Sequence, residues 1–390
     1  MRNAAALSRP AAAPAPPVLP VARPRLPSAD RLLPYLRRID EARWYSNFGP
    51  LVKAFEQRLA ARFAGETSVV TVVNATQALT LALKAMDLPR GSLCALPAWT
   101  FVATAHAVVQ AGLVPWFLDV DFETAMLDPE TVRAALRTAP GRVSAVVPVC
   151  AHGAMPDLEA WLAFREETGL PVLLDAAAAF DQAADARLPT VVSLHATKVL
   201  GIGEGGFFAA QDKALAARVR QMTTYGFAGS REAQVLATNA KLGEHAAAVG
   251  LAALDSWPAD RLQVCFAAQR LRSALTLAPA IVFQPGWGVE WATSVCVVRT
   301  PEDGAAAAVA ALEAQRVETR RWWGDGCHTS RAFSHFPRTE LPATERLARA
   351  TVGLPFAVDL TAEEVARIAG GLARAFGDDR LRSPRAPTRR

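Results

Sequence analysis

The feature that most constrains the fold is a regular alternation of short apolar runs with longer amphipathic segments over residues 69–210. Each run has the length of a strand, and each segment between two runs is long enough for a helix. Chains with this order form a mostly parallel sheet with helices on both faces. We therefore predict an α/β fold with strands at residues 69–73, 93–96, 115–119, 143–149, 171–175, 191–193 and 206–210.

The rest of the chain indicates a second, smaller α+β domain. An alanine-rich segment, residues 244–254, predicts a long buried helix, and Pro258 shortly after it marks a domain boundary. The expected elements beyond Pro258 are strands at residues 281–283 and 294–299 and helices at 305–315 and 362–375. With 390 residues, about half of them apolar, the chain can bury two cores. We predict a large domain over residues 29–257 and a small C-terminal domain over 258–378.

Both ends of the chain are basic. The first 28 residues hold seven prolines, four arginines and no acids, which predicts a disordered extension over 1–28. Residues 380–390 hold five arginines and no acids, and we assign 379–390 as a basic tail. Without these nine arginines the formal charge of +5 becomes −4, so the composition does not support a nucleic-acid-binding body.

Composition also indicates the compartment. No apolar run approaches the ~18 residues that cross a bilayer, and the N-terminal segment lacks the continuous apolar stretch of a signal peptide. The five cysteines are odd in number and scattered, which is typical of reduced thiols. These features predict a cytoplasmic protein that does not bind a membrane.

One acid and one lysine stand out within the alternating region. Asp175 ends the apolar run 171–175, and Lys198 ends the segment 193–198, shortly before a glycine-rich stretch at 203–206. This order is typical of a pyridoxal-phosphate site, in which a lysine amine joins the cofactor aldehyde and a carboxylate pairs with the pyridine nitrogen. We predict Lys198 and Asp175 as the catalytic pair.

The surroundings of both residues suit these roles. An ammonium cannot attack an aldehyde, so the lysine needs weakly polar neighbours that lower its pKa, such as Ala196, Val199 and Leu200. Asp175 stands at the carboxyl end of a predicted strand, where open α/β sheets bind ligands. Taken singly, each residue has a simpler interpretation: Lys198 as a solvated surface lysine, and Asp175 as an aspartate that caps a helix.

Motifs on both sides of this pair resemble, in order from about residue 45 to 372, the DegT/DnrJ/EryC1/StrS family of sugar aminotransferases. This family belongs to the fold-type I pyridoxal-phosphate enzymes. The matching motifs are Ser-Asn-Phe-Gly-Pro at 46–50, Phe-Glu at 55–56, Asn-Ala-Thr-Gln-Ala-Leu at 74–79, Pro-Ala-Trp-Thr-Phe-Val-Ala-Thr at 97–104, Phe-Leu-Asp-Val-Asp at 117–121, His-Gly-Ala-Met-Pro-Asp at 152–157, Asn-Ala-Lys-Leu-Gly-Glu at 239–244 and Gly-Leu-Pro-Phe at 353–356.

The resemblance implies further cofactor contacts. Ala75, Thr76 and Gln77 match the turn before a helix, where free N–H groups and the helix dipole favour the cofactor phosphate. Ser193 matches a phosphate-binding serine, and Phe101 matches an aromatic residue that stacks on the cofactor ring, although core packing would also explain it.

The resemblance also implies substrate and partner contacts. Asn239 matches an asparagine that reaches the phosphate of the partner subunit, which implies a homodimer with composite sites. Lys241 and His328 match positions on the substrate side, although His328 could equally be an ordinary loop histidine.

The activity implied is transfer of an amino group from an amino acid, by analogy glutamate, to a nucleotide-linked keto sugar. Two alternatives stay open: a pyridoxal-phosphate-dependent sugar dehydratase, and a catalytically idle cofactor-binding regulator. The family members that act as dehydratases have histidine in place of the lysine, so Lys198 argues against the first.

The chain departs from the family pattern at three positions. Leu174 stands where the family has Glu, Ala178 where it has Gln or His, and Gly243 where it has Ser. The missing Gln or His would hydrogen-bond the phenolic oxygen of the cofactor, so that bond must come from elsewhere or from water. This loss keeps the idle regulator open as an alternative.

Two other motifs compete with this interpretation. Residues 201–206 match the dinucleotide pattern G-x-G-x-x-G, but the residues that follow predict a strand instead of a helix, so we assign the glycines to a turn beside the Lys198 loop. Cys327, His328 and His335 lack a second cysteine pair or a carboxylate at ligand spacing, so we predict no metal. His152 and His195 could contact the cofactor or the substrate, but we interpret both as structural.

Overall fold

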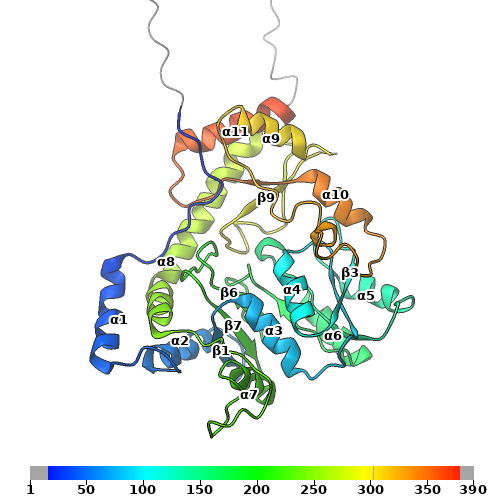
Figure 1. Ribbon diagram of the computed structural model, residues 1–390. Coiled ribbons are helices and arrows are strands. Elements are labelled where there is room, and N and C mark those ends of the chain that lie inside the picture. Colours follow the sequence, from blue (N-terminus) through cyan, green and yellow to red (C-terminus); the bar gives the residue numbers. More distant parts are fainter. Residues whose placement is uncertain (1–15, 302, 378–390) are drawn as a thin grey trace, which may run out of the picture.

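The computed structural model describes residues 16–301 and 303–377 (Figure 1). Its central sheet has the strand order β3-β2-β4-β5-β6-β7-β1, because parallel bridges from Val146 to Val172 and from Val149 to Asp175 join the group β3-β2-β4 to the group β5-β6-β7-β1. Only β7 runs antiparallel to both of its neighbours. The strands are β1 (Ser68–Val72), β2 (Leu93–Pro97), β3 (Val114–Leu118), β4 (Val143–Val146), β5 (Leu174–Asp175), β6 (Thr190–Ser193) and β7 (Gly206–Ala210). The predicted α/β fold and all seven strands are confirmed.

Helices cover both faces of this sheet because side chains alternate along each strand. Phe208 of β7 faces a core formed with α3 and α7, whereas its neighbour Phe207 faces a core formed with α2 and α8. A third core lies under α5 and α6, around Trp116 and Trp161. The helices of this part are α1 (Ala29–Ala42), α2 (Pro50–Ala60), α3 (Ala75–Ala85), α4 (Val102–Gln110), α5 (Pro129–Leu136), α6 (Leu158–Thr168) and α7 (Lys213–Met222).

The helix α8 (Glu244–Ala274) connects the sheet to the C-terminal part of the chain (Figure 1). It continues through Pro258, so the expectation that the helix ends before this proline is wrong. Proline removes one helical hydrogen bond, but Trp257 and Leu271 are buried on the two sides of it and keep the helix packed. None of the helices in the described part of the chain is both long and apolar enough to cross a membrane.

The C-terminal part has its own sheet and core. Strands β8 (Val282–Phe283), β9 (Cys296–Arg299) and β10 (Thr351–Leu354) form an antiparallel sheet in the order β10-β9-β8. The helices α9 (Ala305–Glu313) and α11 (Ala362–Phe376) pack against it, and both were expected from the sequence. The strand β10 and the helix α10 (Pro342–Ala350) were not.

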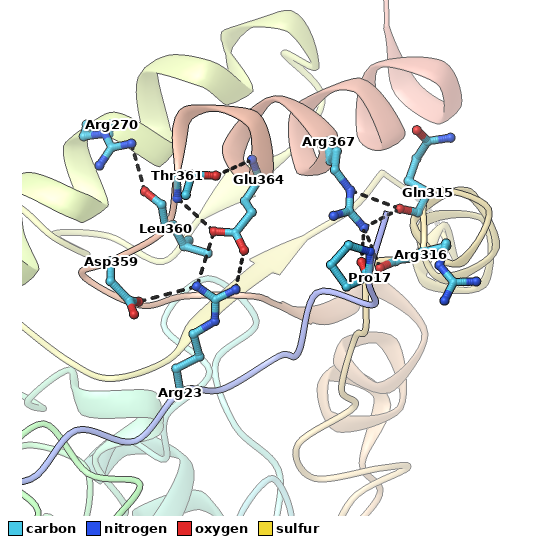
Figure 2. A network of polar contacts seen from close by, with 10 residues as sticks. All are labelled: Pro17, Arg23, Arg270, Gln315, Arg316, Asp359, Leu360, Thr361, Glu364 and Arg367. Carbon is cyan, nitrogen blue, oxygen red and sulfur yellow. Dashed lines mark hydrogen bonds and ion pairs between the residues drawn. The ribbon is translucent and has the colours of Figure 1, made fainter. Parts of the chain in front are cut away.

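An N-terminal strap, residues 16–28, lies along the C-terminal part of the chain. Leu19 is 1% exposed in the core of that part, and its backbone pairs with Val317. Figure 2 shows Arg23 between Asp359 and Glu364. Figure 2 also shows that the guanidinium of Arg367 donates hydrogen bonds to the carbonyl oxygens of Pro17, Gln315 and Arg316.

The predicted disorder of residues 1–28 is therefore wrong for residues 16–28, because buried apolar side chains and ion pairs hold the strap in place. Residues 1–15 and the whole of the predicted basic tail, residues 379–390, lie outside the described residues.

Candidate active site

Asp175 is the buried acid of the site. It ends β5, and its carboxylate accepts hydrogen bonds from the Thr104 hydroxyl at 2.8 Å and from the Ala177 N–H at 3.1 Å. The Thr104 hydroxyl lies 2.8 Å from that of Thr100, which holds it in place. Burial raises the pKa of Asp175, and the two hydrogen bonds and the charge of Lys198 partly oppose this shift.

Lys198 lies in the loop between β6 and β7. Ala196 N–H donates to the Gly203 carbonyl oxygen at 2.7 Å, and Ile202 N–H donates to that of Leu194 at 2.8 Å, so the loop folds back on itself. A side chain at Gly201 would place its Cβ 2.7 Å from the Ala196 carbonyl oxygen, which requires glycine there. The predicted glycine turn is confirmed, and β7 follows it as expected.

The electrostatics of Lys198 and Asp175 are coupled. Burial lowers the pKa of Lys198, and the charge of Asp175 partly opposes this. Both shifts favour the neutral forms, which leaves the lysine more nucleophilic than a surface lysine. Among the described residues, the donors to Asp175 are a hydroxyl and an amide, with no cation hydrogen-bonded to it. A protonated pyridine nitrogen would supply that cation, so the site fits pyridoxal phosphate.

The start of α3 lies at the same edge of the sheet as the end of β6. Asn74 caps α3 by accepting a hydrogen bond from the Gln77 N–H at 2.9 Å. A Cβ at Gly206 would lie 2.7 Å from the Ala75 nitrogen, so β7 begins directly against the first turn of α3. Because Gly206 pairs with Ser193, the sheet brings Ser193 and residues 75–77 together, as an anion site at a helix N-terminus requires.

Phe101 precedes α4 and is 58% exposed. Core packing, the alternative interpretation of this ring, is therefore wrong. Its neighbours Thr100 and Thr104 belong to the hydrogen-bonded chain that ends on Asp175, so Phe101 belongs to the segment that supports the buried acid.

The other predicted contacts are not bonded to Lys198 or Asp175, although Lys241 pairs with Val72 at the end of β1, shortly before α3. Asn239 is exposed, and its Oδ1 accepts a hydrogen bond from Lys241 Nζ at 2.6 Å, while Lys241 Nζ lies 4.9 Å from the centre of the Tyr225 ring. His328 is 7% exposed and packs against Phe117. In the described part of the chain, no hydrogen bond or ion pair joins these three residues to Lys198 or Asp175.

Two buried residues escaped the sequence analysis. Thr104 orients Asp175 across 71 positions of sequence. The sequence feature that could have indicated this role is the Thr-x-x-x-Thr spacing of 100–104, which places both hydroxyls on one side of the α4 N-terminus.

The second of these residues, Glu244, is 1% exposed and accepts hydrogen bonds from the N–H groups of Leu51 and Val52 at 2.7 and 2.9 Å. It therefore caps α2, and Gly49 leaves room for its carboxylate.

His195 has a local hydrogen-bond partner, and the cysteines are free thiols. His195 Nδ1 lies 2.8 Å from the Thr197 hydroxyl, in the Lys198 loop. Cys327 is buried in the core beneath α4, and all five cysteines are free. Within residues 16–301 and 303–377, no group of three or more His, Cys, Asp or Glu side chains could hold a metal ion.

A cavity of about 330 Å³ reaches Lys198. The N-terminal strap, the Lys198 loop and α8 line it, together with Thr293 and Ser294, and Arg31 of α1 lies at its edge. Asp175, Phe101 and Thr76 are not among its lining residues. The cavity therefore meets the candidate cofactor site at the lysine alone.

Comparison with known proteins agrees with this geometry. Residues 28–373 match the model of the DegT/DnrJ/EryC1/StrS aminotransferase family. The chain is 29% identical over 357 residues to Protein Rv3402c of Mycobacterium tuberculosis, covering 87% of this chain and 85% of that one.

Two solved structures are similar to the fold. The structure of DesI with its TDP-sugar product has a TM-score of 0.82 and 32% identity, covering 94% of each chain. A putative PLP-dependent aminotransferase from Bacillus cereus has a TM-score of 0.84 and 27% identity, covering 91% of this chain and 99% of that one. The chain therefore belongs to the DegT/DnrJ/EryC1/StrS aminotransferase family, and its cofactor is pyridoxal phosphate.

Proposed function

We propose that this enzyme transfers an amino group from an amino acid, glutamate being the expected donor, to a nucleotide-linked keto sugar. The observation that carries the proposal is the placement of a partly buried Lys198 and a buried Asp175 at the carboxyl ends of neighbouring strands, in a chain that belongs to a family of aminotransferases. The substrate class is suggested by the similarity to DesI, whose structure contains a TDP-sugar product.

The residues of the site have distinct roles in this proposal. Bound pyridoxal phosphate supplies the electron sink for the carbanion at the donor α-carbon. Lys198 Nζ would hold the cofactor until the donor amine displaces it, and the freed amine would then accept the proton from that α-carbon and later deliver a proton to the sugar carbon that receives the amino group. The Asp175 carboxylate keeps the ring nitrogen protonated, and Ser193 with the first turn of α3 binds the phosphate.

The cavity beside Lys198 suits the acceptor. A nucleotide-linked sugar must bring its carbonyl carbon to the lysine, and the cavity reaches the site at that residue. The diphosphate of such a substrate needs cationic side chains. We infer that Arg31, exposed at the edge of the cavity, supplies one of them.

We further propose that the enzyme is a homodimer with composite sites. Asn239 is exposed at the end of a loop whose apolar side chains Tyr225 and Leu236 are 50% and 92% exposed. Exposed apolar side chains around a polar group favour an interface. Asn239 would then contact the phosphate in the partner's site.

The first test is chemical. Borohydride reduction of the cofactor-loaded protein should fix the cofactor to the peptide that carries Lys198, and mass spectrometry locates it. Incubation with glutamate and a panel of nucleotide keto sugars should then give a product that carries the new amino group. Labelling of another lysine would overturn the site. A yellow protein that never converts its cofactor with any amino acid would support an idle regulator.

The second test separates the subunits. Lys198→Ala and Asn239→Ala homodimers should each be poorly active. In a mixed dimer both lesions fall in one site and the other site is whole, so activity should return to about half of the wild-type value, because each subunit contributes the same surface. If subunits exchange and activity stays at the level of the parents, the composite site is wrong.

A further inference from the structure

His152 is held in one orientation beside the active site. It lies in the short 3-10 turn Ala151–Gly153, and its φ of 55° is in the left-handed region that few residues other than glycine adopt. The Thr293 hydroxyl donates a hydrogen bond to its carbonyl oxygen at 2.9 Å. Its ring stacks on Trp323, with centroids 4.1 Å apart and planes 23° apart. The side chain has little freedom to turn.

The Nε2 atom of this ring is buried, yet no hydrogen-bond partner for it exists in the described part of the chain. The residue is only 7% exposed. Nearly all buried polar groups in proteins have a partner, so an orphaned nitrogen in a fixed ring points to a ligand. Burial and the charge of Lys198 lower the pKa of His152 to about 3, so the imidazole is neutral and carries one N–H.

The turn that carries His152 packs against the segment that follows Asp175. A Cβ at Gly153 would lie 3.1 Å from the Ala178 carbonyl oxygen. Thr293, whose hydroxyl donates to the His152 carbonyl oxygen, lines the same cavity as Lys198, so the turn also lies on the lysine side of the site. His152 is thus close to both Lys198 and Ala178.

The chemistry of pyridoxal phosphate identifies the group that would lie there. Its phenolic oxygen is attached to the ring carbon that lies between the carbon bearing the aldehyde and the methyl-bearing carbon next to the ring nitrogen. A cofactor held by Lys198 at its aldehyde and by Asp175 at its ring nitrogen would carry this oxygen on one of the two ring edges between these residues. Ala178 follows Asp175 by three positions and its side chain is a methyl group, which cannot donate a hydrogen bond.

We propose that His152 Nε2 donates a hydrogen bond to the phenolic oxygen of the cofactor and so replaces the polar side chain that Ala178 lacks. The proposal rests on the proposed roles of Lys198 and Asp175. His152 would stabilise the ionised form of the phenolic oxygen and fix the tilt of the ring. It would therefore be a cofactor-binding residue drawn from a turn before α6 instead of from the segment after β5.

The test is a pH titration of the visible absorbance of the cofactor-loaded protein. His152→Asn is the main variant, because asparagine tolerates positive φ and its shorter side chain does not reach as far. The titration midpoint should rise by about one to two pH units, since a hydrogen bond to an ionised group is lost. The dissociation constant of pyridoxal phosphate, measured by equilibrium dialysis, should increase about tenfold or more.

Two further variants keep the test decisive. His152→Gly also tolerates the positive φ and should give the same shift. Adding Ala178→Gln to His152→Asn should move the midpoint back toward the wild-type value. If both single variants retain the cofactor on Lys198 and titrate as wild type does, the proposal is wrong. If the wild-type protein does not carry the cofactor on Lys198, the proposed function fails instead.

Discussion

The hydrogen bond from Thr104 to Asp175 allows a quantitative prediction. Thr104→Val keeps the shape of the side chain and removes the hydroxyl that donates to Asp175 at 2.8 Å. A hydrogen bond to an ionised group contributes about 1.5–3 kcal/mol, which corresponds to a rise of about one to two units in the pKa of Asp175. This rise adds to the shift that burial already causes.

The consequence is a slower reaction, because a carboxylate that protonates more easily holds the protonated ring nitrogen less well. The same free energy, expressed in the transition state, slows the reaction about 10- to 100-fold. The assay is a single turnover of the cofactor-loaded enzyme with glutamate, followed by the absorbance of the cofactor. The acidic limb of the pH profile should also move to higher pH, since the pKa of the essential carboxylate has risen.

Thr104→Ser is the matched control, because it keeps the hydroxyl and loses only the methyl group. It should react at close to the wild-type rate, with the same pH profile. Equal rates for Thr104→Val and Thr104→Ser would show that the hydroxyl does not support Asp175. A loss of cofactor from both variants would show that α4 itself has moved, which circular dichroism would detect.

Three further predictions concern residues outside this hydrogen bond. Glu244→Ala leaves two buried N–H groups of α2 without an acceptor, so the free energy of unfolding measured in urea should fall by about 2–4 kcal/mol, and Glu244→Gln should lose less. Leu19→Ala should release the strap and speed trypsin cleavage within residues 16–28, whereas Leu26→Ala, at a position that is 37% exposed, should not. Arg31→Ala should raise KM for the nucleotide sugar about tenfold, at the scale of a charge-assisted hydrogen bond, and leave KM for the amino donor unchanged, with Arg37→Ala of the same helix as the control.

Local patterns in the sequence predicted the parts of the fold that depend on neighbouring residues. The apolar runs gave all seven strands of the large sheet, and the glycines at 201 and 203 indicated the turn that carries Lys198. Asp175 was identified because it ends a predicted strand, and open α/β sheets bind their ligands at the carboxyl ends of the strands. These features need only short-range periodicity and turn chemistry.

The features that were missed depend on residues far apart in the chain. Glu244 caps α2 across about 190 positions, and Arg23 pairs with Glu364 across more than 300. No local pattern identifies such partners. The strap shows why composition misleads: its prolines and arginines are typical of disorder, but Leu19 and Val21 are buried and Arg23 pairs with Glu364, which together dock it.

The same burial that prepares the site makes the stability of the protein depend on its cofactor. In the cofactor-free protein the raised pKa of Asp175 means that stability is lost as pH rises above the carboxyl's unfolded value. The lowered pKa of Lys198 means that stability is lost as pH falls below the lysine's unfolded value, so neutral pH lies in the unfavourable range of both groups.

Pyridoxal phosphate removes both costs, because it gives Asp175 a cationic partner and converts the amine of Lys198. Removing the cofactor should therefore lower Tm, by the equivalent of about 4 kcal/mol when the cofactor had been present at a thousandfold excess over its Kd. Lys198→Met places an apolar side chain where a partly buried ammonium was costly. Without cofactor, this variant should melt above the cofactor-free wild type in differential scanning calorimetry at neutral pH. A lower Tm for Lys198→Met would contradict the assignment of Lys198 as a partly buried amine whose charge is destabilised.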